Sequence, residues 1–260
     1  MRLPLDHVGF VGADTQQLAE TFRALGFHVT KPAVLSTSNT NDLSQKAVQS
    51  SAHIMFRNSY IELTSVKPCP PDHHLAAFQG QDNAIRLLVL HSEDAGQRAE
   101  QLFRAGLAVS DVSTASRALL YGKQDTAQFR WFSLLDDPVP RTLTVFVEHQ
   151  TREAVFHQEV SQHPNSINRI SALHHRPGSI PGALCDDSAY QVDLIETPAK
   201  EPGENPAGPF FVGMTLQAKN LLSCERDLGE NQVPFECKGS SLYISATHAA
   251  GAVLYIEESK

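Results

Sequence analysis

Residues 14–26, DTQQLAETFRALG, decide the fold because they recur as residues 94–106, DAGQRAEQLFRAG, at an offset of 80. The identical positions include the first residue, Asp14 and Asp94, which is a preferred helix N-cap. They also include the last residue, Gly26 and Gly106, which commonly ends a helix. Two unrelated amphipathic helices would share this start and stop chemistry. Agreement of both ends and of the helix face nevertheless favours an internal repeat.

Strand-like segments surround each copy. Apolar or β-branched runs of strand length precede each helix, at residues 5–12 and 85–91. After the first helix the sequence shows three strand-like runs, at 27–29, 52–57 and 60–65, and the last two have counterparts after the second helix at 129–135 and 143–149. Each copy therefore predicts a βαβββ module, the first over residues 5–66 and the second over 84–150.

The second half repeats this pattern less regularly. Residues 210–258 carry strand and helix signals in the order of the module, whereas 168–197 carry strands without a helix. We expect paired modules in residues 1–150, a linker at 151–167, and a degraded second pair of modules at 168–260.

Composition limits the function classes. Hydrophobic residues make up 41% of the 260 residues and charged residues 19%, as in globular proteins. The net charge of −8 argues against a nucleic-acid or membrane-surface partner, because phosphates repel an acidic protein. The four cysteines form no CxxC motif, and neither a signal peptide nor a membrane-length apolar run is visible. We therefore expect a cytoplasmic location.

Several motifs, in order, resemble one superfamily. They are Leu5-Asp6-His7-Val8-Gly9, Tyr60-Ile61-Glu62-Leu63, Phe129-Arg130-Trp131, Phe146-Val147-Glu148-His149 and His163-Pro164-Asn165. Together they resemble glyoxalase-like members of the vicinal oxygen chelate superfamily, well over residues 5–170 and weakly beyond. Ser166 departs from that pattern, which has Gly after the Asn. The resemblance implies an α+β fold in which tandem βαβββ modules pair into open, curved mixed sheets.

The resemblance also implies a metal site on the concave face of the sheet. In the superfamily, the first and last strands of each module supply the ligands of a divalent metal such as Zn, Ni, Mn or Co. The positions that match are His7, Glu62 and Glu148, with Glu62 and Glu148 as the catalytic carboxylates. The fourth position, at the offset of 80 from His7, is Leu87, which cannot bind a metal. No nucleotide cofactor is expected, because no phosphate-binding glycine loop is visible.

Strand alternation gives an expected face for each site residue. Taken singly, His7 could be a core histidine and Glu62 a strand-end carboxylate, but together they favour a site. By the same alternation His149 should face away from the pocket. The expected substrate-pocket residues are Trp131, Phe146, Phe129 and His53, for which ordinary core packing is the alternative.

Two hypotheses about function follow. The first is a metal-dependent lyase or isomerase that acts on a small carbonyl compound through an enediolate. The second is a metal-free protein that binds or sequesters a small molecule, which Leu87 favours. A ring-cleaving dioxygenase fits less well, because one His with two Glu departs from the two-His, one-carboxylate triad. The expected partner is a small-molecule ligand, and a homodimer is left open.

Overall fold

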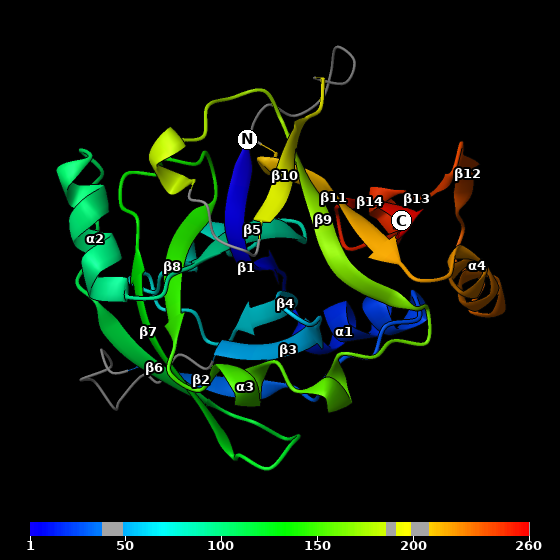
Figure 1. The fold of residues 1–260 in the computed structure, drawn as a ribbon, viewed down its shortest axis with the longest axis horizontal. Coiled ribbons are helices and arrows are strands. Elements are labelled where there is room, and N and C mark those ends of the chain that lie inside the picture. The colour runs from blue at the N-terminus through cyan, green and yellow to red at the C-terminus, as the bar shows by residue number, and fades with distance from the viewer. Residues whose placement is uncertain (38–48, 186–190, 199–207, 260) are drawn as a thin grey trace.

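The computed structural model describes residues 1–37, 49–185, 191–198 and 208–259. Their strands form one connected, strongly curved set of sheets with the longer helices on the outside (Figure 1). The first module consists of β1 (Arg2–Val11), α1 (Thr15–Ala24), β2 (Ala33–Thr37), β3 (Gln49–Met55) and β4 (Tyr60–Val66). The second consists of β5 (Ala84–His91), α2 (Ala95–Arg104), β6 (Ser113–Ala118), β7 (Thr126–Ser133) and β8 (Leu143–His149). The expected α+β fold of curved, strand-rich modules is confirmed.

The repeated helices begin and end where the sequence predicts. The side chain of Asp14 accepts hydrogen bonds from the backbone N–H groups of Gln16 and Gln17, at 2.8 and 3.2 Å. Asp94 accepts from Gln97 N in the same way, at 3.0 Å. Just past each helix the chain turns through a glycine with positive φ, +83° at Gly26 and +87° at Gly106.

The two modules form a closed ring of strands. Within each module the first strand lies parallel to the last, β1 to β4 and β5 to β8. Between modules, β1 pairs antiparallel with β5, and β2 pairs antiparallel with β6. Strands β1, β4, β3, β2, β6, β7, β8 and β5 therefore follow one another around a barrel. The pairing of β2 with β6 closes what we expected to be an open sheet.

Gly9 allows β1 and β5 to approach closely. A Cβ on Gly9 would lie 2.4 Å from Cδ1 of Leu87, so the Leu87 side chain occupies that space. The close approach fixes Leu87 opposite the first strand of module one, inside the barrel.

The remaining strands continue from the barrel. They are β9 (Ile167–His175), β10 (Gln191–Glu196), β11 (Phe211–Ala218), β12 (Glu236–Lys238), β13 (Ser241–Ile244) and β14 (Val253–Glu258), with α4 (Leu221–Glu230) after β11. Their order is β12, β13, β14, β11, β9, β10, and β10 pairs antiparallel with residues 2–4 of β1. Strand β11 lies parallel to β14 as β1 does to β4. Among the described residues between β9 and β10 there is only a short 3-10 helix, Gly182–Leu184.

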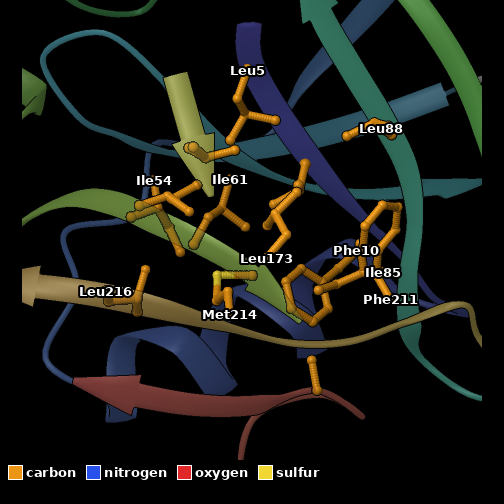
Figure 2. Close-up of a cluster of buried hydrophobic side chains, with 14 of the residues drawn as sticks. Leu5, Phe10, Ile54, Ile61, Ile85, Leu88, Leu173, Phe211, Met214 and Leu216 are labelled. Carbon is orange, nitrogen blue, oxygen red and sulfur yellow. The ribbon is translucent and has the colours of Figure 1, made fainter. Parts of the chain in front are cut away.

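The main core lies between the barrel and this second sheet. Figure 2 shows Leu5 and Phe10 of β1 beside Leu173 of β9 and Met214 of β11. All four side chains are at most 1% exposed. Because successive strand residues face opposite sides, outward-facing Phe10 leaves its neighbour Gly9 facing the barrel interior. The second half thus covers the outside of the barrel and leaves its inside for a pocket.

A smaller apolar cluster closes one part of the barrel. Helix α3 (Arg152–Val155) and a 3-10 helix, Gln158–Val160, follow β8, and they bring Val155 and Val160 into contact with a cluster that contains Tyr60 and Phe129. In the part of the chain that the structure describes, no helix has both the length and the apolar character of a membrane span.

Candidate functional site

The barrel encloses a pocket of about 110 Å³ with two chemically different sides. Module one supplies the polar side, which contains His7, Gln49, Ser51, His53, Tyr60 and Glu62. Strands β5 and β8 of module two supply an aliphatic side, which contains Leu87, Val89, Leu143, Val145 and Val147. The rest of the lining is Ala33 and Leu35 of module one, His74 of the segment between the modules, and Ala115, Arg117, Phe129 and Trp131 of module two. Such a pocket suits a small amphipathic ligand.

His7 and Glu62 meet on the polar side. Nε2 of His7 lies 3.2 Å from Oε2 of Glu62, and the His7 ring stacks on Tyr60 with centroids 4.0 Å apart. Ser51 donates its hydroxyl hydrogen bond to Oε1 of Glu62 at 2.5 Å, and Gln49 Nε2 lies 3.4 Å from the same oxygen. Hence both oxygens of the Glu62 carboxylate have partners.

A second carboxylate lies behind His7. Asp6 is fully buried, with Oδ1 2.7 Å from His7 Nδ1 and Oδ2 2.7 Å from His149 Nε2. The order of contacts is therefore His149, Asp6, His7, Glu62. His149 was expected to face away from the pocket, but it turns inward to Asp6 because it shares the face of Val145 and Val147.

The two carboxylates favour the imidazolium form of His7. Each ring nitrogen faces a carboxylate oxygen, and only a doubly protonated ring can donate to both. Burial alone would lower the pKa of His7, but Asp6 and Glu62 outweigh burial and raise it. Burial would raise the pKa of Glu62, but the hydrogen bond and charge of His7 hold that pKa well below its usual value. The Asp6 carboxyl is likewise held ionised, because His149 and His7 outweigh its burial and lower its pKa.

Arg117 brings a further positive charge into the pocket. It is only 6% exposed, and its Nη1 lies 2.6 Å from each ring nitrogen of His53. Its guanidinium also lies over the rings of Tyr60 and Phe129, at 5.6 and 5.9 Å. Burial and then the Arg117 charge lower the pKa of His53 well below its usual value, so His53 is neutral. Nη2 of Arg117 has no hydrogen-bond partner among the described residues.

The structure brings some of the predicted residues to the pocket and leaves others out. His7, Glu62, Trp131, Phe129 and His53 line it. By contrast, Glu148 and Phe146 lie on the opposite face of β8, contrary to expectation. Oε2 of Glu148 accepts hydrogen bonds from Ala95 N at the start of α2, at 2.8 Å, and from Arg130 at 2.9 Å. Phe146 stacks on Phe132 in the main core.

Strand pairing shows which residue corresponds to Glu62 in module two. Gly9 pairs with Glu62, and the equivalent pair in module two is Val89 with Val145. The resemblance assigned His7, Glu62 and Glu148 as ligands with Leu87 at the fourth position, but the strand register puts Val145 in the place of Glu148. The side chains of Leu87 and Val145 have no donor atom. Among the described residues, no group of three or more His, Cys, Asp or Glu side chains is placed to hold a metal ion. The residues present therefore do not fit the divalent site of the superfamily.

Among the charged groups of the site and the residues that pair with them, sequence reasoning missed Asp6, His149 and Arg117. Asp6 had a signal, because a carboxylate inside an apolar strand needs a buried partner. The sequence signal for Arg117 was weaker: alternation in β6 places it on the same face as Ser113 and Ala115, and Ala115 lines the pocket. For His149 the register of β8 had to be known first.

Comparisons with known proteins agree with this architecture. A family model described as a glyoxalase-like domain matches residues 5–178. No curated protein matches the sequence significantly.

Solved structures resemble the chain at low sequence identity. A hypothetical protein from Staphylococcus aureus superposes with a TM-score of 0.61 at 9% identity, over 100% of both chains. A mutant of 4-hydroxymandelate synthase from Streptomyces coelicolor gives a TM-score of 0.59 at 12% identity, over 98% of this chain and 92% of that one. Methylmalonyl-CoA epimerase from Streptomyces coelicolor gives 0.40 at 17% identity, over 58% of this chain and 100% of its own. For the two structures with TM-scores near 0.6, the likeness at these identities concerns the fold alone.

Proposed function

Starting from the fact that the chain belongs to the glyoxalase-like family, we propose that its barrel binds a small carbonyl compound that carries a carboxylate, such as a short 2-oxo acid. Protein cations, and not a divalent metal, engage the oxygens of this ligand. The observation that carries the proposal is that apolar side chains stand where metal ligands were expected, while a buried arginine supplies positive charge. Leu87 and Val145 stand at two expected ligand positions, while Arg117 adds a buried cation that has a free N–H among the described residues.

The two sides of the pocket orient such a ligand. A guanidinium pairs with a carboxylate through two parallel hydrogen bonds, so the ligand carboxylate belongs at Arg117. The aliphatic residues of β5 and β8 suit the apolar body. The ketone oxygen would then share with Glu62 the hydrogen bond that His7 Nε2 donates.

The same arrangement is compatible with turnover. A proton held beside the ketone oxygen stabilises negative charge that develops on it, which is what enediolate chemistry requires. Asp6 would keep the His7 ring oriented and charged during such a step. We propose ligand binding, and lyase or isomerase activity would require this binding as its first step.

Trp131 provides the readout for a test. It is the only tryptophan of the chain and it lines the pocket, so its fluorescence reports on occupancy. We would titrate 4-methyl-2-oxopentanoate into the protein in the presence of EDTA. Saturable change is expected, and Arg117→Gln should weaken binding about 10- to 100-fold, the loss of a charged hydrogen bond of about 1.5–3 kcal/mol.

Two controls make the result specific. Arg104→Gln removes one charge from an exposed site on α2 and should leave the affinity unchanged. The neutral ketone 4-methyl-2-pentanone lacks the carboxylate and should bind wild type and Arg117→Gln alike. Equal affinity of wild type and Arg117→Gln for the 2-oxo acid, or no saturable signal at millimolar concentrations, would overturn the proposal.

A metal-dependent lyase or isomerase is the second candidate, and one observation favours it. His7 Nε2 and Glu62 Oε2 both face the pocket 3.2 Å apart, and Asp6 stands behind His7 as carboxylates stand behind metal-binding histidines. This candidate expects stoichiometric Zn, Ni, Mn or Co after dialysis and its loss in His7→Ala. Elemental analysis of both proteins decides between the candidates.

A further inference from the structure

A second cavity, of about 360 Å³, adjoins the first. The two cavities share Ala33, His53 and Arg117, so the Arg117 guanidinium lies at their junction. The second cavity, called the outer pocket here, is further lined by Arg23, Lys31, Tyr121 and Glu159. A ligand seated in the barrel could therefore extend past Arg117 into the outer pocket.

The outer pocket is basic in an otherwise acidic protein. The chain has a net charge of −8, yet the described lining of this pocket holds Arg23, Lys31 and Arg117 against one carboxylate, that of Glu159. That carboxylate already accepts the Gly122 N–H at 3.1 Å and lies 3.8 Å from His157 Nδ1. Within the described residues, no carboxylate forms an ion pair with Arg23 or Lys31. A concentration of unpaired positive charge in a cavity attracts anions.

Arg117 adds an independent observation. Only 6% of the Arg117 residue surface is exposed. Its Nη2 has no hydrogen-bond partner in the part of the chain that the structure describes. A buried guanidinium with an unused N–H is costly unless a ligand satisfies it. Because Arg117 belongs to both cavities, an anion in the outer pocket can supply the missing acceptor.

We propose that the outer pocket is a subsite for a multiply charged anionic group, of the phosphate or pyrophosphate class. The natural ligand would then be a small carbonyl compound joined to such a group, with Arg23, Lys31 and Arg117 holding the anion. Only the placement of the carbonyl end rests on the function proposed above. The anion subsite itself rests on Arg23, Lys31 and Arg117, which all line the outer pocket.

Inorganic pyrophosphate is the probe for this subsite. We would titrate it calorimetrically into the full chain at low ionic strength, with wild type and the double variant Arg23→Gln/Lys31→Gln. The double variant should bind at least 10-fold more weakly, and binding to wild type should weaken as salt is raised. The control is Arg57→Gln/Arg104→Gln, which removes two charges outside both pockets and should change the affinity less than 2-fold.

A second measurement separates this proposal from the previous one. The Arg23→Gln/Lys31→Gln protein should still bind 4-methyl-2-oxopentanoate with wild-type affinity, which also shows that it is folded. Pyrophosphate binding without 2-oxo acid binding would refute the proposed function and leave the anion subsite standing. Absence of pyrophosphate binding, or an equal loss in both double variants, would overturn the subsite.

Discussion

His7 lies between two carboxylates, and the charge on its ring follows from that position. The two oxygens that face the ring, Oδ1 of Asp6 and Oε2 of Glu62, can both accept a hydrogen bond from His7 only when the ring is doubly protonated. The sequence predicted His7 and Glu62 in one site, from the family resemblance and because a carboxylate in the apolar strand of Glu62 needs a partner. It did not predict Arg117, whose strand is short and contains few apolar residues.

Replacing Asp6 tests this network. Asp6→Asn keeps the size of the side chain but removes the charge that both His7 and His149 face. Breaking a buried pair on one side costs on the order of 3–5 kcal/mol of unfolding free energy. Urea unfolding at pH 7 measures this loss, and an NMR titration should show a lower His7 pKa. Asp14→Asn is the control, because Asp14 is an exposed helix cap and Asn caps equally well. Equal losses of unfolding free energy in Asp6→Asn and Asp14→Asn would contradict the His149, Asp6, His7, Glu62 network.

The pH dependence of stability has a defined sign at His7. Its folded pKa is raised above the ordinary 6.5, so its stabilisation is complete below pH 6.5 and is lost as pH rises through the folded pKa. Asp6 and Glu62 remain ionised there because their pKa values are lowered.

The His7→Gln variant isolates that contribution. The difference in unfolding free energy between wild type and variant should be largest at about pH 5–6.5 and should shrink as pH rises further. Chemical denaturation at a series of pH values measures it. Neutral buried histidines such as His163, whose pKa is lowered to about 4 by burial, give the opposite pH trend. They are present in both proteins, so their contribution cancels in the difference. A difference that grows with pH would show that His7 is not the charged partner.

At the scale of elements, local signals were predictable and the strand register was not. The helix caps follow from residues within one turn, so Asp14, Asp94, Gly26 and Gly106 could be identified from sequence. The face of Glu148 depends on the lengths of the connections between β5 and β8. Module two has a different spacing there from module one, so Val145 and not Glu148 corresponds to Glu62. A shift of this kind by an odd number of residues moves every side chain to the other face.

The two helix-ending glycines form a matched pair for mutation. Both have positive φ, so Gly26→Ala and Gly106→Ala each introduce backbone strain of about 1 kcal/mol. A Cβ on Gly106 meets nothing within 4 Å, whereas one on Gly26 lies 2.9 Å from Asn165 Cβ and 3.0 Å from Asp227 Oδ2. We expect Gly26→Ala to be the more destabilising by about 1–3 kcal/mol, as overpacking is. Equal thermal stabilities of the two variants would show that α1 does not end against Asn165 and α4.

At the scale of the whole molecule, the barrel and the second sheet depend on pairings that no local pattern encodes. The repeat predicted two modules, but the antiparallel pairing of β2 with β6 that closes the ring joins distant segments. The second sheet packs on the barrel because the outward-facing apolar residues of β1 and β5 would otherwise be exposed to water (Figure 2). The inside of the barrel is then free to hold polar groups.

Met214 tests whether the two halves form one cooperative unit. It is fully buried where β11 packs on the barrel, so Met214→Ala should cost about 2–5 kcal/mol. Trp131 fluorescence and far-ultraviolet circular dichroism should lose their signals together at a lower denaturant concentration. Leu222→Ala, at a residue that is 71% exposed, should change stability by less than about 0.5 kcal/mol. An unchanged Trp131 transition in Met214→Ala would mean that the halves unfold independently.

Whether protein cations or a metal engage the ligand is the central claim, and one calorimetric comparison tests it. The titrant is 4-methyl-2-oxopentanoate, and the protein is first stripped with EDTA and then supplied in turn with Zn, Ni, Mn or Co. With Leu87 and Val145 at two ligand positions and Arg117 in the pocket, we predict the same Kd within about 2-fold in every case, and binding about 10- to 100-fold weaker in Arg117→Gln. Binding that tightens 10-fold or more with one of these metals, and no longer does so in His7→Ala, would contradict the account.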